Sequence, residues 1–216
     1  MNKFLTLAIA GFAVIAASPA MALTQTVTGS FGQSTTDLNN ATFTVSGFTA
    51  GGTLNSATIS LNGSAITNGS VTNTGAQSAN FTITSSVALA LSGPFTSSPL
   101  NISFAPSTTV SNLASGATAT FGPITGSNSS ANLVGTPLSA FTSGPITFTA
   151  NTSTSNSTAG GGGNNRTTLS TTVGGTVTIV YDYTAPTPPP TTVPEPASMA
   201  LLGMGLAGLG LIRRRA

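Results

Sequence analysis

Apolar and polar residues alternate along most of the chain, as in a strand that has one buried side and one side facing solvent. The stretch from Phe81 to Ser92 shows this best, because large apolar residues occupy most of its odd positions and Thr, Ser or Ala its even ones. Ser85 is the exception, a hydroxyl on the predicted inner face. Shorter stretches of the same kind occur at 43–45, 57–61, 100–104, 146–148 and 177–183.

Glycine and proline interrupt the alternation and predict turns. They occur in the pairs Gly51-Gly52, Asn68-Gly69, Gly93-Pro94, Gly122-Pro123 and Gly144-Pro145. Strong helix formers are scarce between the terminal segments, so no helix is expected there. The pattern predicts an all-β fold, an antiparallel β-sandwich of roughly eight to ten strands over residues 23–184, flanked by an N-terminal signal helix and a C-terminal transmembrane helix.

Two stretches depart from the alternation. Residues 151–165 are rich in Ser, Thr and Asn and end near the glycine run Gly160 to Gly163, a composition with little apolar surface to bury. We therefore expect a mobile loop there. Residues 184–196 contain several prolines, which predicts an extended spacer whose central part, 185–192, links the sandwich to the C-terminal segment.

The N-terminus has the layout of a secretory signal peptide. Lys3 gives it a positive charge, an apolar run follows from Phe4 to Ala17, and Ala20-Met21-Ala22 is a small-x-small cleavage site. We expect signal peptidase to remove residues 1–22, so that the mature chain begins at Leu23. The alternative, an uncleaved anchor, is disfavoured by the shortness of the apolar run.

The C-terminus combines a short motif, an apolar run and a basic cluster. These are Pro194-Glu195-Pro196, residues 197–212, and Arg213, Arg214 and Arg215. As a helix the apolar run would be about 24 Å long, a little short of a bilayer core of about 30 Å, so we expect a marginal transmembrane helix. Arginines next to a span are retained on the cytoplasmic side, which places the body of the protein outside the cytoplasm.

Residues 193–216 resemble a PEP-CTERM sorting signal, because motif, apolar run and basic cluster occur in that order. The resemblance implies processing near Pro194 by an exosortase-type membrane enzyme. It further implies transient or retained attachment to the inner membrane. The protein would then be delivered to the cell surface or exopolysaccharide matrix of a Gram-negative bacterium. The alternative is an ordinary tail anchor in which Pro194-Glu195-Pro196 is accidental.

The body, residues 23–184, more diffusely resembles the choice-of-anchor E domains that often precede such tails. The matching segments are Gln25-Thr26-Val27, Gly52-Thr53-Leu54 with residues 57–63, Leu138 to Thr142 with Gly144 and Ile146, and Gly175 to Tyr183. This resemblance implies no catalytic residues and no cofactor.

Charge is concentrated in the terminal segments. The formal net charge is +2, but Lys3 and the three C-terminal arginines account for four of the five basic residues. Between residues 23 and 192 only Asp37, Arg166 and Asp182 are charged, so the body is nearly neutral and has no nucleic-acid footprint. The chain has no Cys, so its exported body is held without disulfides.

The residue content restricts the chemistry. Without His or Cys, the chain lacks the groups for Ser-His-Asp triads, cysteine nucleophiles and zinc sites. Asp37 and Asp182 are the one carboxylate pair in the body that could serve glycoside hydrolysis, and they are too few for a typical calcium site. The run from Gly160 to Gly163 lacks the Lys and the strand-to-helix context of a phosphate loop.

Binding functions are less restricted. Tyr181 and Tyr183 with surface Asn could recognise a sugar, but their parity predicts that both face inward. Threonine pairs on several strands could order water, although Thr is also the simplest polar strand former. The sequence therefore favours a non-catalytic structural or adhesive protein of the cell surface or extracellular matrix. The alternative is a carbohydrate-binding module with exopolysaccharide as its partner.

Overall fold

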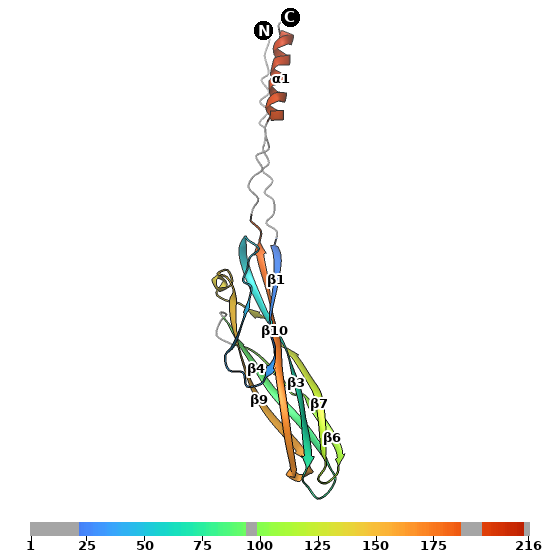
Figure 1. Cartoon of the computed structure of the whole chain (residues 1–216). Coiled ribbons are helices and arrows are strands. Elements are labelled where there is room, and N and C mark those ends of the chain that lie inside the picture. Colours follow the sequence, from blue (N-terminus) through green and yellow to red (C-terminus); the bar gives the residue numbers. More distant parts are fainter. Residues whose placement is uncertain (1–21, 94–98, 187–195, 214–216) are drawn as a thin grey trace. The chain divides into compact units, whose positions relative to one another are not determined.

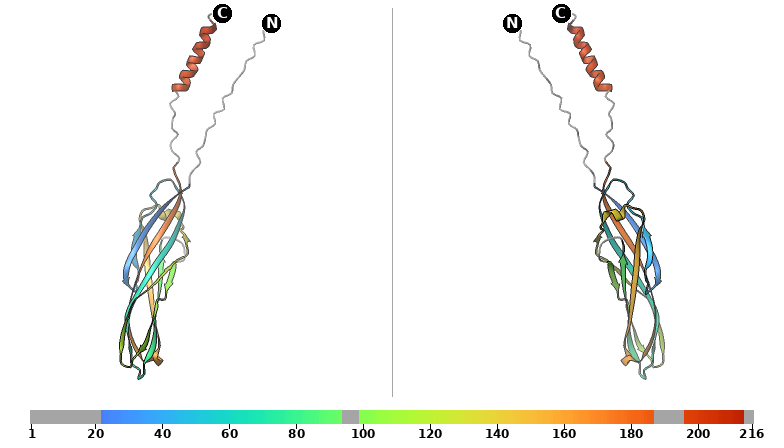
Figure 2. Two further views of the ribbon diagram at one scale, coloured as in Figure 1. Left: turned by 90° about the vertical axis from the view of Figure 1, so that its right-hand side faces the viewer. Right: turned by 90° about the vertical axis from the view of Figure 1, so that its left-hand side faces the viewer.

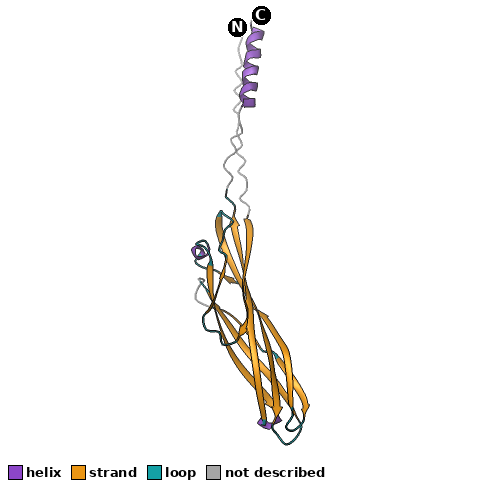
Figure 3. Ribbon diagram, viewed as in Figure 1, coloured by secondary structure: helices purple, strands orange, loops and turns teal. Residues whose placement is uncertain are grey.

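The computed structural model describes residues 22–93, 99–186 and 196–213 (Figure 1). The chain divides into two units, a body that ends at Ala185 and a C-terminal unit that begins at Pro186. The body is built almost entirely of strands (Figure 3). The predicted signal helix lies outside the described residues, and Ala22 is already the first residue of a strand.

Ten strands form two antiparallel sheets in the described part of the body, which confirms the predicted sandwich. Sheet A has the order β1 (Ala22–Thr35), β10 (Asn165–Thr184), β3 (Thr53–Asn73) and β7 (Thr118–Ser129), with β8 (Leu133–Val134) also beside β3. Sheet B has the order β2 (Ala41–Val45), β9 (Ile146–Gly160), β4 (Ala79–Ser92) and β5 (Leu100–Phe104), with β6 (Ser107–Leu113) also beside β4.

The alternation predicted for 81–92 is present in β4. Its odd-numbered residues are buried and its even-numbered ones are partly or fully exposed. Ser85, the predicted hydroxyl on the inner face, is 1% exposed. Tyr181 is also fully buried, while Tyr183 is half-buried.

The two longest strands, β3 and β10, pair along nearly their whole length. The ladder runs from Asn165↔Asn73 to Thr184↔Thr53. A strand of 20 residues at about 3.3 Å per residue is roughly 65 Å long, so the body is elongated. Because Ala22 pairs with Thr184, β1 begins where β10 ends, so the first and last strand residues of the body lie at one end (Figure 2). We call this the proximal end and the opposite one, marked by Asn73, the distal end.

The prediction of a mobile loop at 151–165 is wrong. Residues up to Gly160 belong to β9, which pairs with β4 from Ser92↔Thr149 to Phe81↔Gly160, and β10 begins at Asn165. This segment buries little apolar surface, but its backbone forms hydrogen bonds with β4, and these hold it as a strand. Thr also suits a paired strand without being buried. Only residues 161–164 form the connection, and Gly160 to Gly163 have φ values of +111°, +59°, +62° and +84° that favour glycine.

Two predicted turns are β-bulges instead. Asn68-Gly69 lies inside β3 and Gly122-Pro123 inside β7, opposite each other where the β3–β7 register shifts between Thr67 and Gly69. Gly122 has a φ of +107°, so this bulge requires glycine as a turn would. The other predicted punctuation at Gly51-Gly52 and Gly144-Pro145 does separate strands.

The body also contains two single-turn helices that the sequence did not predict. One is a 3-10 helix at Leu138–Phe141, which brings the buried Phe141 into the core, and the other is Gly161–Gly163 in the glycine connection. No α-helix occurs between residues 22 and 186 in the part that the structure describes.

The C-terminal unit contains the helix α1 (Pro196–Arg213). This element confirms that the apolar run 197–212 is helical. However, none of the helices among the described residues has the length and hydropathy that crossing a membrane requires, so the predicted transmembrane span is not shown. The 18 residues of α1 correspond to a length of about 27 Å, and four of these residues are glycines. Most of the predicted proline linker, from 187 on, lies outside the described residues.

Apolar side chains between the sheets form two clusters. The larger one fills the proximal two thirds and includes Ile59, Leu89, Phe148 and Tyr181. The smaller one, at the distal end, consists of Val71, Phe81, Ile83 and Leu113 with partly buried neighbours. A layer of hydroxyl groups lies between the two clusters.

The hydroxyl layer consists of Thr67 on β3, Ser85 on β4 and Thr171 on β10, all buried. Thr171 Oγ1 is 3.0 Å from Thr67 Oγ1 and 3.0 Å from Ser85 Oγ. One hydroxyl of sheet A thus connects its neighbour in the same sheet to sheet B. Each buried hydroxyl has a partner, which avoids the cost of an unsatisfied polar group.

The hydroxyl layer predicts an unequal response to two variants. Thr171→Val keeps the shape but leaves the hydroxyls of Thr67 and Ser85 buried without a partner, so it should lower the free energy of unfolding by about 1–3 kcal/mol. The triple variant Thr67→Val/Ser85→Ala/Thr171→Val removes all three groups and should recover most of that loss. Urea unfolding of the full chain, followed by circular dichroism, measures both. A triple variant as unstable as the single one would contradict this account.

Candidate functional site

The sorting residues predicted from the sequence lie at the boundaries of described elements. Pro196 is the first residue of α1, a position that suits proline because its missing N–H is not needed there, and Arg213 is the last. Ala22 is the first residue of β1. Pro194, Glu195, Arg214, Arg215 and Ala20 lie outside the described residues.

The surface of α1 is apolar and uncovered. Leu201, Leu202, Met204 and Leu206 are 62–71% exposed. An added Cβ at Gly203 or Gly210 would meet no atom within 4 Å. The helix by itself thus carries a patch of exposed apolar side chains, a feature that is typical of interaction surfaces.

The two aspartates of the body do not meet. Asp37 Oδ1 accepts a hydrogen bond of 3.1 Å from the N–H of Thr154 on β9, whereas Asp182 Oδ2 accepts one of 2.8 Å from the hydroxyl of Ser56 on β3. The N–H of Thr36 bonds to Thr171 O, which fixes the turn of Asp37 beside that residue of β10.

The separation of these aspartates excludes a shared site. From Thr171 to Asp182 β10 advances by eleven residues, or about 35 Å, while a glycosidase pair lies about 5–9.5 Å apart. β1 and β10 do pair, as first and last strands often do, but Asp37 follows the end of β1 and Asp182 lies near the opposite end of β10. Each aspartate instead holds neighbouring strands together.

No group of three or more His, Cys, Asp or Glu that could hold a metal occurs among the described residues. The three charges of the body are also spread out, since Arg166 pairs in register with Thr72 at the distal end and is exposed. The body therefore offers hydroxyl, amide and backbone groups rather than charged ones.

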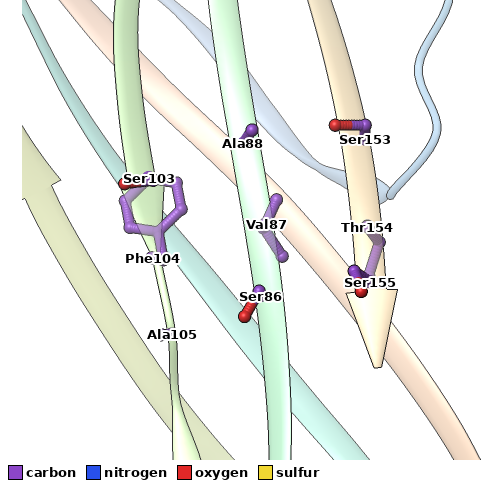
Figure 4. A pocket seen from close by; sticks show the side chains of 9 residues that line it. All are labelled: Ser86, Val87, Ala88, Ser103, Phe104, Ala105, Ser153, Thr154 and Ser155. Carbon is purple, nitrogen blue, oxygen red and sulfur yellow. The ribbon is translucent and has the colours of Figure 1, made fainter. Parts of the chain in front are cut away.

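A groove of about 550 Å³ lies on the outer face of sheet B (Figure 4). It is lined by residues 86–88 of β4, 103–105 at the end of β5 and 153–155 of β9. Its outward side chains are small: Ser86 and Ala88 form its floor, and Ser103, Ser153 and Ser155 line its sides. Thr154 Oγ1 is buried there and has no hydrogen-bond partner. The groove can offer hydroxyl groups but no charge and no outward aromatic ring.

A second groove of about 400 Å³ crosses the outer face of sheet A. Its floor is the backbone of Gly174-Gly175 on β10. Gln33 Nε2 on β1 donates a hydrogen bond of 3.0 Å to Ser64 Oγ on β3, so its side chain bridges over the intervening Gly174. An added Cβ at Gly174 would lie 3.1 Å from Gln33 Nε2, so a larger residue would displace this bridge.

The tyrosines are part of the core and not of a sugar platform. Tyr181 O–H donates to Ser46 O at 3.2 Å, and its ring contacts Phe48 and Phe141 at centroid distances of 5.7 and 6.2 Å. Tyr183 packs against Phe48 at 5.1 Å. No aromatic residue is among the exposed large apolar side chains of the described part.

The threonine pairs are divided between the sheets: those on β2, β4 and β9 are on sheet B, whereas Thr176 and Thr178 are on β10 of sheet A. Thr42 is in register with Thr149 and Thr44 with Thr147 across β2 and β9. On β4 and β6, Thr82 Oγ1 is 3.4 Å from Thr109 Oγ1. Thr82 and Thr109 thus hydrogen-bond across neighbouring strands, which favours a role as polar strand residues.

Comparison with known proteins adds one family. Residues 192–215 match the PEP-CTERM protein-sorting motif. The chain therefore carries this motif, which is associated with export and with processing by an exosortase. No curated protein matches the chain.

Solved structures with some likeness are viral. The infectious bursal virus derived T=1 particle is 15% identical over 81% of this chain and 41% of that chain, with a TM-score of 0.19. The structure of the infectious bursal disease virus Gx strain is 17% identical over 82% of this chain and 42% of that chain, with a TM-score of 0.18. This chain spans about two fifths of the length of those proteins, and scores this low support no argument.

The burial of the Tyr181 phenol predicts that the folded protein loses stability at high pH. Burial raises the pKa of its phenol from 10.0 to about 12, so the folded state holds the proton more tightly than the unfolded one. The resulting stabilisation is complete below pH 10 and is lost as the pH rises from about 10 towards 12.

Tyr181→Phe tests this directly. At pH 7 it should cost about 0.5–1.5 kcal/mol, because the hydrogen bond to Ser46 O is lost. As the pH rises from 10, the difference between wild type and variant should shrink. Chemical denaturation at several pH values measures it, and a constant difference would contradict the prediction.

Proposed function

We propose that this protein is a non-catalytic structural or adhesive component of the cell surface or extracellular matrix of a Gram-negative bacterium, exported and then sorted by its PEP-CTERM signal. The observation that supports it most is the sorting motif at 192–215. Signal peptidase and an exosortase-type enzyme are the processing partners, and the inner membrane holds the tail at least transiently.

The arrangement of the body supports the proposal. Its first and last strands begin and end at the proximal end, where Ala22 pairs with Thr184. Cleavage before Leu23 would remove only Ala22, the first residue of the ladder, and the second processing site near Pro194 follows its last residue, so the rest of the paired strands would stay intact. The elongated body would then present its distal end and its two nearly uncharged sheets to the surroundings.

A non-catalytic role agrees with the described side chains. Asp37 and Asp182 are far apart and each is engaged in holding strands together. Both grooves are lined by hydroxyl, amide, aliphatic and backbone groups around partly buried phenylalanines. A carbohydrate-binding module remains the alternative and is less well supported, because sugar stacking requires an exposed aromatic face.

The sorting signal can be tested by changing Pro194-Glu195-Pro196 to alanines. We expect the variant to accumulate with an uncut tail in the membrane fraction, whereas the wild-type chain is recovered at the mature mass from the surface or matrix. Intact-mass spectrometry of each fraction measures this. An unchanged mass and location would reduce the tail to a simple anchor, and Thr192→Ala, outside the tripeptide, is the matched control.

The carbohydrate alternative predicts saturable, sugar-specific retention of the full chain on exopolysaccharide. We expect no such retention. As a control, Ser86→Tyr would fill the groove on sheet B. Saturable binding of the wild-type chain to exopolysaccharide that this variant loses would overturn the proposal that the protein is not a lectin. Retention that is equal for the wild-type chain and Ser86→Tyr, and that does not saturate, agrees with a structural role.

A further inference from the structure

The margins of the two sheets differ in how well they are protected. A strand at a sheet margin has a row of backbone groups without a ladder partner, and natural proteins usually protect it by shortness, proline, bulges or charge. β2 has five residues, and β5 and β6 are short and separated by a segment that contains Pro106. β7 is interrupted by the Gly122-Pro123 bulge. Three of the four margins are therefore protected.

The fourth margin, β1, lacks these features from Ala22 to Phe31. It is 14 residues long and contains neither proline nor a charged side chain. Its pairing with β10 is regular from Ala22↔Thr184 to Phe31↔Gly175, and the register shifts only after Phe31. β1 is at the end of the strand order of sheet A, so its other side has no ladder partner among the described residues (Figure 2).

The sequence of this regular segment is nearly symmetric about Val27. It reads Leu-Thr-Gln-Thr-Val-Thr-Gly-Ser-Phe from Leu23 to Phe31. Reversed, it again has an apolar residue at each end, a hydroxyl next to it and threonine on both sides of the valine. Such symmetry suits antiparallel pairing of a strand with a second copy of itself, because a two-fold axis would then pass through the central residue.

We propose that β1 is a self-association edge, at which two copies of the chain pair antiparallel around Val27 and join their two sheets A into one. Thr26 lies opposite Thr28 of the second copy, and Thr24 opposite Ser30. Leu23, which is 38% exposed in the single chain, lies opposite Phe31. Residues of the same face therefore meet throughout, as a continuous sheet requires.

A second copy fits this edge better than an unrelated peptide. The symmetric pattern is satisfied by the same segment in reverse, and the neutral body adds almost no charge repulsion between copies. Pairing over nine residues would add about eight to ten backbone hydrogen bonds. The inference goes beyond the proposed function, since sorting by the tail needs no association of the bodies.

Sedimentation of the full chain in mild detergent tests the proposal. We expect a monomer–dimer equilibrium at micromolar concentrations. Thr26→Lys should weaken it by up to about fivefold, because the two lysines would lie diagonally across the new ladder, roughly 7–8 Å apart. Thr178→Lys is the matched control, since it adds the same charge to the same outer face but on the inner strand β10. Circular dichroism verifies that both variants are folded.

Spin labels test the register. The chain has no native cysteine, so a single label on Thr28→Cys reports only distances between copies. We expect label distances below about 20 Å there and much longer ones for Thr168→Cys, near the distal end of β10. A monomeric wild type would overturn the proposal. A dimer that withstands Thr26→Lys, or that lacks the short Thr28 distance, would also overturn it and assign association to another surface such as α1.

Discussion

The pairing of β3 with β10 is the constraint on which the rest of the body depends. Their ladder contains 20 register pairs and at its proximal end joins residues more than a hundred positions apart, Thr53 and Thr184. β1 is added to one side and β7 with β8 to the other, and β3 and β10 supply eight of the 19 buried residues of the larger cluster and Val71 of the smaller one. Without disulfides or a metal, backbone pairing and burial of side chains hold this fold.

Small side chains let the two sheets adopt this form. Gly63 faces the rings and methyls of Leu89, Ile102 and Phe104, and an added Cβ there would lie within 2.7 Å of one of them. At the transition between the clusters, hydroxyls replace methyls, and Thr67, Ser85 and Thr171 satisfy one another. The smaller cluster is therefore separated from the larger one by hydrogen-bonded groups rather than by continuous apolar packing.

The alternation of apolar and polar residues predicted most strands and even the inward position of Ser85, because every second side chain of a half-buried strand faces the core. It did not predict β9 beyond residue 151, since that segment is held by pairing with β4 rather than by burial. Asn68-Gly69 and Gly122-Pro123 signal a local backbone irregularity, and only the strand register distinguishes a bulge from a turn.

The sequence placed the sorting signal at 193–216, and the family match at 192–215 confirms it, because that motif is contiguous and local. The grooves were not predicted. Gln33, Ser64 and Gly174 come from three strands, and nothing local in the sequence indicates that one side chain lies over the others. The resemblance of residues 23–184 to choice-of-anchor E domains stays a prediction. The nearly symmetric segment about Val27 is readable in the sequence, but it acquires meaning only when β1 is known to be at a margin.

The position of the C-terminal connection has a mechanical consequence. The tail continues from the end of β10, a strand between two neighbours that run along most of its length. A force that pulls the distal end away from an anchored tail would act along the strands and load many hydrogen bonds of β10 in shear at once, instead of peeling them one after another. Such loading favours resistance to extension, the property that a tethered surface protein needs under flow.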